Sequence, residues 1–166
     1  MSTELTPAEY AALLAELTEQ EDRLQFSRFT HADAWALGST LVEVATERSL
    51  GITIDIQRGD QQVFHAALAG TTADNDDWIA RKVRTVRRFG ASSFLVGRRF
   101  AADEKDFNAA TGLPFSQNVA HGGCFPIVIR DAGIVGTVTV SGLAQADDHA
   151  LAVEILEQLL AEGVLV

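Results

Sequence analysis

The chain has 166 residues and a mass of 17.8 kDa, with 47% hydrophobic and 22% charged side chains, which is typical of one globular domain over residues 1–166. Its formal net charge of −10 argues against general nucleic-acid binding, because that binding requires a basic surface. No apolar run approaches the roughly 18 residues of a membrane helix, and the N-terminus lacks the basic start of a secretion signal, so a cytoplasmic protein without a membrane partner is expected.

Two helices and a short strand are predicted at the N-terminal end. Thr6 begins a capping box with proline at the first helical position, which predicts a helix within residues 1–22. We expect that segment to be peripheral. Residues 24–29 are predicted to form a short strand, and Thr30 to cap a second helix over about residues 31–49.

Two β-hairpins are predicted from alternating, β-branched stretches on either side of polar turns. The first hairpin pairs residues 52–56 with residues 62–66. The second pairs residues 125–130 with residues 134–140 across an Asp-Ala-Gly turn. Both pairings predict antiparallel strands.

Helices are predicted between and after these hairpins. Asp74 is expected to cap a helix that reaches Phe89, and residues 91–112 are expected to form helical pieces or loops. A last helix is predicted over residues 146–161, with a broad apolar arc. Helices that alternate with hairpins favour the α+β class, in which an antiparallel β-sheet is covered by helices.

The basic residues are concentrated in one part of the chain. No acidic residue lies between Asp77 and Asp103, and this window carries a charge of +7, which leaves −17 for the rest of the chain. Two interpretations stay open: a solvated helix face that pairs with acids elsewhere, or an anion pocket. The seven basic residues are Arg81, Lys82, Arg84, Arg87, Arg88, Arg98 and Arg99.

Three of these basic side chains are candidates for contact with a ligand. At 100° per residue, Lys82 falls inside the apolar arc of its helix, whereas Arg81 projects to the opposite side. A lysine in that position must reach solvent along its stem, pair with an acid, or bind a ligand. Arg98 and Arg99 could together form a bidentate clamp for carboxylates or phosphates.

Two glycine motifs flank the second hairpin and resemble a known family. That stretch is similar to the haem-degrading-domain family, the relatives of the GlcG and HbpS proteins. Flanking sequence over residues 77–89 and 145–149 resembles its cytoplasmic branch, an uncharacterised protein family, and the resemblance covers about residues 50–160. The motifs are Gly122-Gly123 through Pro126-Ile127 and Gly136 through Val140-Ser141-Gly142.

The resemblance implies an α-β-α sandwich of profilin-like architecture, built on an antiparallel sheet. Members of the family are usually homo-oligomers and are linked to haem, cobalamin or other small molecules. Haem is therefore a candidate cofactor. The resemblance transfers no catalytic residue and no haem ligand to a numbered position of this chain.

The glycines and Ser141 predict a binding site at the open end of the hairpin. Gly122, Gly123 and Gly142 have no Cβ, so their N–H groups could approach an anion or a flat ring, beside a helix start with free N–H groups. The two chain ends of an antiparallel hairpin are adjacent, so these loops could converge. The alternative is that the glycines only permit tight turns and close packing.

His121 and His149 flank the same hairpin, so they are expected to lie within range of each other. Either could ligate haem iron or act as an acid or base. His149 falls on the buried arc of the last helix, and a core or capping role stays open for both histidines. His121 and Cys124 offer only two metal ligands, whereas a closed zinc site needs four, so no metal site is predicted.

The leading hypothesis is a homo-oligomer that binds an anionic small molecule, with haem or another tetrapyrrole as candidates. Two alternatives remain: an enzyme that acts on such a ligand, with His121 or His149 as acid or base, or a scaffold whose glycines and charges serve subunit packing. The candidate ligand-binding residues are Lys82, Arg98, Arg99, His121, Gly122, Gly123, Ser141, Gly142 and His149.

Overall fold

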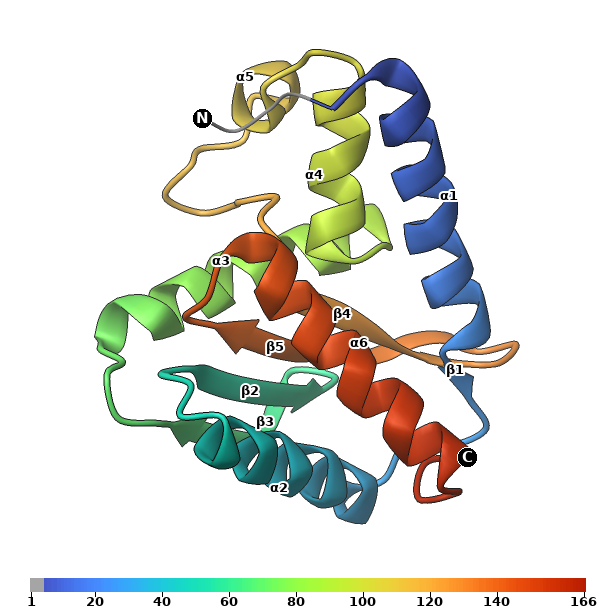
Figure 1. The fold of residues 1–166 in the computed structure, drawn as a ribbon, viewed down its shortest axis with the longest axis vertical. Coiled ribbons are helices and arrows are strands. Elements are labelled where there is room, and N and C mark those ends of the chain that lie inside the picture. The colour runs from blue at the N-terminus through green and yellow to red at the C-terminus, as the bar shows by residue number, and fades with distance from the viewer. Residues whose placement is uncertain (1–4) are drawn as a thin grey trace.

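Helices and strands alternate along the chain in a computed structural model that describes residues 5–166. Within these residues there are six helices and five strands (Figure 1). In chain order they are α1 (Pro7–Arg23), β1 (Gln25–Phe26), α2 (His31–Glu47), β2 (Thr53–Arg58), β3 (Gln61–Ala67), α3 (Ala73–Phe89), α4 (Ser93–Ala102), α5 (Phe107–Thr111), β4 (Cys124–Ile129), β5 (Gly133–Ser141) and α6 (Gln145–Ala161).

The strands form one sheet in the order β1-β4-β5-β2-β3. Both predicted hairpins are confirmed, as β2–β3 and β4–β5, and β2 joins them by antiparallel pairing with β5. β1 departs from the expected all-antiparallel sheet, because Gln25 and Phe26 pair in parallel with Val128 and Ile129 of β4. The α+β class is confirmed, with a sheet that is mixed at one edge.

One face of the sheet is apolar and is covered by α2 and α6. The strands place Phe125, Val138, Ile56 and Phe64 at directly paired positions, and Ile54 continues the same face along β2. Successive side chains of a strand point to opposite faces, so every second residue of these strands enters this core. α2 and α6 contribute leucines and isoleucines from the other side, so this layer is the main hydrophobic core.

The opposite face is polar and is covered by α3. Its central paired positions are Cys124, Thr139, Asp55 and His65. α3 adds only a small apolar cluster here, formed by Ile79, Val83 and Val86 with Cys124. Helices therefore lie on both faces of the sheet, which confirms the expected α-β-α sandwich (Figure 1).

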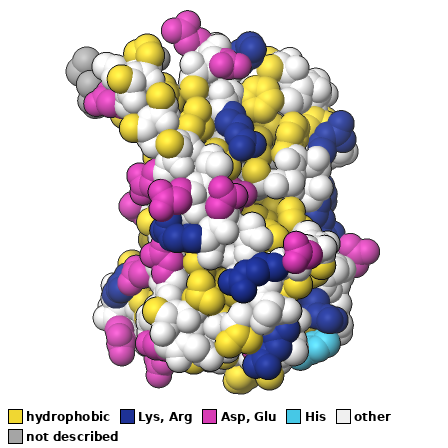
Figure 2. All heavy atoms as spheres, turned by 90° about the vertical axis from the view of Figure 1, so that its right-hand side faces the viewer, with side chains coloured by type: hydrophobic (Ala, Val, Ile, Leu, Met, Phe, Trp, Pro, Cys, Tyr) yellow, Lys and Arg dark blue, Asp and Glu magenta, His cyan; other side chains and the backbone are white. Residues whose placement is uncertain are grey.

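A smaller apolar cluster joins α1, α4 and α5 beside the sandwich. Leu17 of α1 packs with Phe94 and Leu95 of α4 and with Phe107 of α5. Residues 91–112, expected as helical pieces or loops, thus contain two helices. On the outer surface, Arg23 of α1 pairs with Glu157 of α6. Figure 2 shows acidic and basic side chains interspersed on this face of the molecule, the right-hand side of Figure 1.

Side-chain caps define where most helices begin. The capping box predicted at Thr6 and the cap predicted at Thr30 are confirmed, and Thr30 forms a full capping box with Asp33. The predicted cap of α3 at Asp74 is wrong: Thr72 has the extended backbone of a cap, and its hydroxyl accepts the Asp74 N–H while Asn75 completes the box. No helix within the described residues is long and apolar enough to span a membrane.

Candidate functional site

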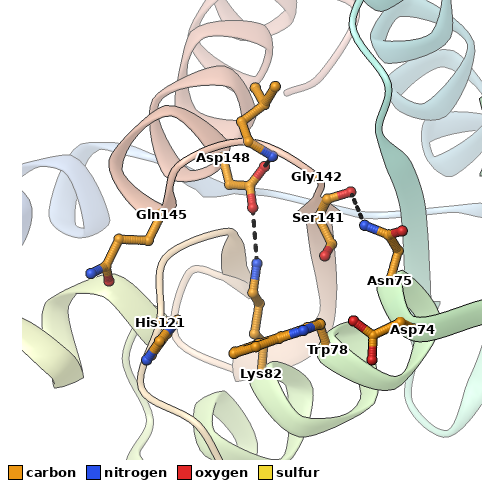
Figure 3. A pocket seen from close by; sticks show the side chains of 10 residues that line it. Asp74, Asn75, Trp78, Lys82, His121, Ser141, Gly142, Gln145 and Asp148 are labelled. Carbon is orange, nitrogen blue, oxygen red and sulfur yellow. Dashed lines mark hydrogen bonds and ion pairs between the residues drawn. The ribbon is translucent and has the colours of Figure 1, made fainter. Parts of the chain in front are cut away.

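A cavity of about 210 Å³ opens where the start of α3 meets the end of β5 and the start of α6. Figure 3 shows Lys82 reaching from α3 toward Asp148, with His121 and Gln145 on one side and Asp74 and Asn75 on the other. The hairpin ends thus do converge, and the predicted site residues Lys82, His121, Ser141 and Gly142 line one cavity. The remaining lining residues are Asp74, Asn75, Trp78, Leu143, Gln145 and Asp148.

A buried ion pair closes the inner end of the cavity. The Lys82 Nζ lies 3.0 Å from Asp148 Oδ2 and donates to the carbonyl of Val140 at 3.1 Å. Both charged side chains are only 3% exposed. The expectation that Lys82 lies on the buried side of its helix and has a compensating partner is therefore confirmed, and ligand contact by its amine stays a prediction.

The Asp148 carboxylate also holds the loop between β5 and α6. Its Oδ1 accepts the N–H of Leu143, in the loop just before α6, at 2.9 Å, and the N-cap residue of α6 itself makes no side-chain cap hydrogen bond. Burial raises the pKa of the Asp148 carboxyl above its ordinary value, while the Lys82 ammonium and the backbone donors oppose that shift. The carboxylate thus connects α3, β5 and α6 at one point.

The glycines of the motif give the backbone room for these contacts. A Cβ on Gly123 would lie 2.7 Å from the Lys82 Nζ, and its φ of 128° favours glycine. A Cβ on Gly122 would overlap the backbone of Gln145, whose side chain accepts the Gly122 N–H at 3.3 Å. Gly142 has a φ of 151° and faces the carbonyl of Gly51. Of the three, only Gly142 lines the cavity.

His121 forms an aromatic wall of the cavity with Trp78. Their ring centroids are 5.1 Å apart and tilted by 36°. His121 remains exposed, and partial burial together with the positive charges of Lys82, Arg98 and Arg81 lowers its pKa below the ordinary value. The imidazole is thus held neutral at physiological pH, and both a lone pair and an N–H are available to a ligand.

Arg81 differs from the sequence-based expectation that it faces away from the core. It is buried, its guanidinium lies 4.2 Å from the Trp78 ring centroid and 5.2 Å from that of Phe115, and it pairs with Asp77 at 2.9 Å. Trp78 lies one helical turn before Arg81, and Phe115 approaches from the loop after α5. Cation–π contact with the two rings stabilises the buried guanidinium. A projection of α3 alone cannot predict this burial, because Phe115 belongs to another segment.

Arg98 and Arg99 do not form the expected clamp at the cavity. Arg98 is half-buried, with its guanidinium 5.3 Å from the Phe94 ring centroid, and its Nε has no hydrogen-bond partner within the described part of the chain. Arg99 is exposed. Burial raises the pKa of Glu21 on α1, and the positive charge of Arg99 opposes that rise. Neither lines the cavity, although the Arg98 charge lowers the pKa of His121.

His149 lies outside the cavity. It is 4% exposed, its ring packs between Phe94 and Phe125, and its Nε2 is 2.8 Å from the Gln20 Oε1 of α1. Burial lowers the pKa of His149 to about 4. Neighbouring positions on a helix point about 100° apart, so Asp148 faces the cavity while His149 faces α1. The expected shared site of His121 and His149 is therefore not formed.

Several lining residues escaped the sequence-based prediction, above all Asp148, Asn75 and Trp78. An acid on the buried arc of the last helix is as unusual as a lysine on the buried arc of the third, and that shared anomaly could have indicated the pair. Within residues 5–166 no group of three or more His, Cys, Asp or Glu could hold a metal ion. Burial raises the pKa of the Cys124 thiol to about 12, so this thiol stays protonated.

Comparison with known proteins identifies the family. Residues 29–157 match the family described as haem degrading protein HbpS-like. UPF0303 protein SCO2848 of Streptomyces coelicolor is 53% identical over 158 residues, which cover 95% of this chain and 100% of that protein.

Solved structures agree with this match. The Ybr137w protein superposes with a TM-score of 0.84 at 32% identity, covering 91% of this chain and 89% of that one. A PduOC:heme complex superposes with a TM-score of 0.63 at 15% identity, covering 78% and 93%, which indicates a shared fold. The resemblance expected from the glycine motifs is confirmed, and the chain belongs to the HbpS-like haem-degrading protein family.

Proposed function

We propose that this protein binds a flat, anionic small molecule at the cavity between α3, β5 and α6, with haem as the specific candidate. The observation that carries the proposal is the His121 imidazole, which is exposed at the cavity wall, packs against the Trp78 ring at a tilt of 36°, and has a pKa that partial burial and nearby positive charges lower. A neutral imidazole is a common axial ligand of haem iron. Family membership and the fold shared with a haem complex support the same ligand class.

The residues around His121 suit a ring with carboxylate substituents. Trp78 and the half-exposed Phe115 offer apolar contact, and their rings meet edge to face at 5.9 Å. The Lys82 ammonium has a third N–H beyond its two bonds, which can donate to a propionate, and the positive charge of Arg98 acts near His121 from outside the cavity. Bound haem would supply an iron centre that His121 coordinates, while the protein orients it through these contacts.

The size of the cavity determines how such a ligand would sit. Its volume of about 210 Å³ is below the roughly 300–1,000 Å³ of pockets that enclose drug-sized ligands. Only an edge or a carboxylate arm of a tetrapyrrole would enter, beside Lys82 and Ser141. The remainder would lie over the outer surface formed by Trp78 and Phe115.

A haem titration followed in the Soret band tests this proposal. The unmodified protein should give a saturating shift that His121→Ala abolishes and that His31→Ala, at an exposed histidine on α2, leaves unchanged. His149→Gln should also leave the band unchanged, since His149 faces α1. Weak, non-saturating binding that is identical in all variants would exclude haem. Iron-free protoporphyrin, followed by quenching of tryptophan fluorescence, then tests a flat anion without iron coordination.

Two further properties belong to this proposal: a cytoplasmic location and a homo-oligomeric state. The uneven charge, with +7 in one window of a chain of −10, supports pairing between subunits. A mass near 18 kDa by light scattering, across a range of concentrations, would contradict the oligomer. The alternative of an enzyme acting on the ligand would require turnover that disappears in His121→Ala.

A further inference from the structure

Helix α2 presents apolar side chains on two of its faces. The inner face enters the main core through Leu37, Leu41 and Ala45, which are fully buried. The outer face carries Trp35, which is 67% exposed, although tryptophan is on average a highly buried residue. The core therefore accounts for the inner face of α2 and leaves the outer face without a partner in the described chain.

A groove with a volume of about 510 Å³ follows the outer face of α2. Phe64 of β3 forms its second wall, and the missing Cβ of Gly38 lets the Phe64 ring lie against the helix. The Trp35 ring meets the Phe64 ring edge-on, with centroids 5.7 Å apart, and Val42 continues the apolar surface. Exposed apolar surface with an aromatic side chain at its centre is typical of a contact with another molecule.

The α2 residues that line the groove recur at the spacing of a helix–helix contact. Trp35, Ser39, Val42 and Thr46 follow one another at intervals of four, three and four positions, so they form one stripe along the helix. The Thr46 hydroxyl donates to the Val42 carbonyl at 2.7 Å and needs no further partner. From Trp35 to Glu47 the lining extends about 18 Å, or slightly more than three helical turns. That length fits a helix lying in the groove.

The groove carries negative charge. Of the residues that line it, only Glu43 and Glu47 are charged, and both are exposed. Neither forms an ion pair within residues 5–166, so their charge is available to a partner. The other charged groups near the two ends of the groove are already paired, as Arg28 with Asp33, Asp60 with Arg87, and Arg48 with Glu154.

The described part of this chain does not supply a matching helix. Its most basic helix is α3, where Arg84 and Arg88 are exposed, but Val83 and Val86 of that helix are buried against the sheet. A second copy of α2 would bring no basic side chain on its own stripe to meet the two glutamates. Charge complementarity therefore favours a helix from a different protein.

We propose that this groove binds a basic amphipathic helix of a partner protein. Its apolar side chains lie against Trp35, Val42 and Phe64, and its lysines or arginines lie beside Glu43 and Glu47. This is the helix-in-groove mode of recognition, in which apolar anchors one and two turns apart enter a groove. The groove shares no lining residue with the ligand cavity, so this interaction is independent of the function proposed above.

Fluorescence anisotropy with two labelled synthetic helical peptides tests the charge requirement. Both peptides carry leucines at positions i, i+4, i+7 and i+11, and the flanking positions are lysine in one and glutamate in the other. The lysine peptide should bind the unmodified protein at least about tenfold more tightly, and added salt should reduce this difference. Equal affinity for the two peptides would overturn the proposal.

Variants of the protein locate the binding surface. Trp35→Ala should weaken binding of the lysine peptide at least about 30-fold, whereas Ile134→Ala, at an exposed apolar residue on β5, should leave it unchanged. Glu43→Lys/Glu47→Lys should reverse the preference, so that the glutamate peptide binds more tightly. Unchanged binding in Trp35→Ala, with circular dichroism showing a retained fold, would contradict the assignment of this groove.

Sedimentation velocity distinguishes a partner protein from a second copy. Trp35→Ala should sediment with the same mass as the unmodified protein over a range of concentrations, because the groove is open in whatever assembly this chain forms. A lower mass in Trp35→Ala would show that a second copy covers the groove, and the proposed partner helix would then be wrong.

Discussion

The two faces of the sheet differ in chemistry although the same strands build them. The face beneath α2 and α6 carries Phe125, Val138 and Ile56 at paired positions, all 1% exposed or less. The face beneath α3 carries Thr139 and Asp55 at the next positions along the same strands, equally buried. The first face supplies the main core, and the second supports a helix that borders the cavity.

Because of this difference, most of the hydrophobic stabilisation comes from one face of the sheet, while the cavity lies next to the helix on the other face. α3 lies over polar groups and contributes few apolar contacts, so the Lys82–Asp148 pair is a principal tie between α3 and α6. Burial raises the pKa of Asp55 on this face, while amide donors from Gln57 and Gln62 oppose the shift. Disturbing each face in turn should show which interactions hold the fold and which shape the cavity.

The largest effect is expected from breaking the ion pair at the edge of the polar face. Lys82→Met leaves the Asp148 carboxylate buried without its partner, which should lower the free energy of unfolding by roughly 3–5 kcal/mol in urea denaturation. Lys82→Met/Asp148→Asn should recover most of the loss. Arg88→Met, at an exposed residue of α3, is the matched control and should change it by less than about 0.5 kcal/mol.

On the apolar face, removing core volume should cost nearly as much. Ile56 is fully buried, so Ile56→Ala should lower the free energy of unfolding by roughly 2–5 kcal/mol through lost burial and a remaining cavity. Ile134→Ala on the exposed end of β5 serves as the comparison. A similar small change in both variants would mean that the core on this face is not close-packed.

Acid should destabilise the protein through His149, a polar group within the apolar layer. Its pKa of about 4 in the folded protein lies below the ordinary 6.5, so between these values the unfolded chain binds more protons. Stability from this group is complete above about pH 6.5 and falls by about 3 kcal/mol as the pH drops to 4. The pH dependence should flatten in His149→Gln and persist in His31→Gln.

The smallest effect is expected from the unpartnered hydroxyls of the polar face. The Thr53 Oγ1 is buried without a hydrogen-bond partner in the described chain, so Thr53→Val should be neutral or stabilising by up to about 1 kcal/mol. The reciprocal change Val140→Thr puts a hydroxyl into the apolar face and should cost roughly 1–3 kcal/mol. A clear loss in Thr53→Val would show that the hydroxyl has a bonded partner, such as an internal water.

Local patterns predicted the elements of this fold well. Capping boxes at Thr6 and Thr30 and the two hairpins depend on residues a few positions apart, so they can be recognised along the chain. The inward position of Lys82 followed from helical periodicity alone. The α3 cap was misplaced because Thr72 and Asp74 are both good caps, and backbone geometry decides between them.

Contacts between distant segments decided the candidate site. Arg81 is buried because Phe115 reaches it from another loop, and His149 turns to Gln20 because α1 packs against α6. Asp148 meets Lys82 across 66 positions of sequence. Partners at such separations depend on how the layers pack, and helical periodicity carries no information about them.

The sequence by itself determined the class, the helices α1, α2, α3 and α6, the hairpins and the family, because each is encoded by short-range periodicity or by a contiguous motif. Only the tertiary structure decided that His121 borders the cavity while His149 lies in the core, and that Arg98 and Arg99 stay outside it. The physical reason is that the sequence does not show in which direction each of these side chains points relative to the other layers. A side chain's position along the chain follows from sequence, whereas the neighbour it faces depends on the rotation of its helix against the sheet, which the packing of both faces sets together.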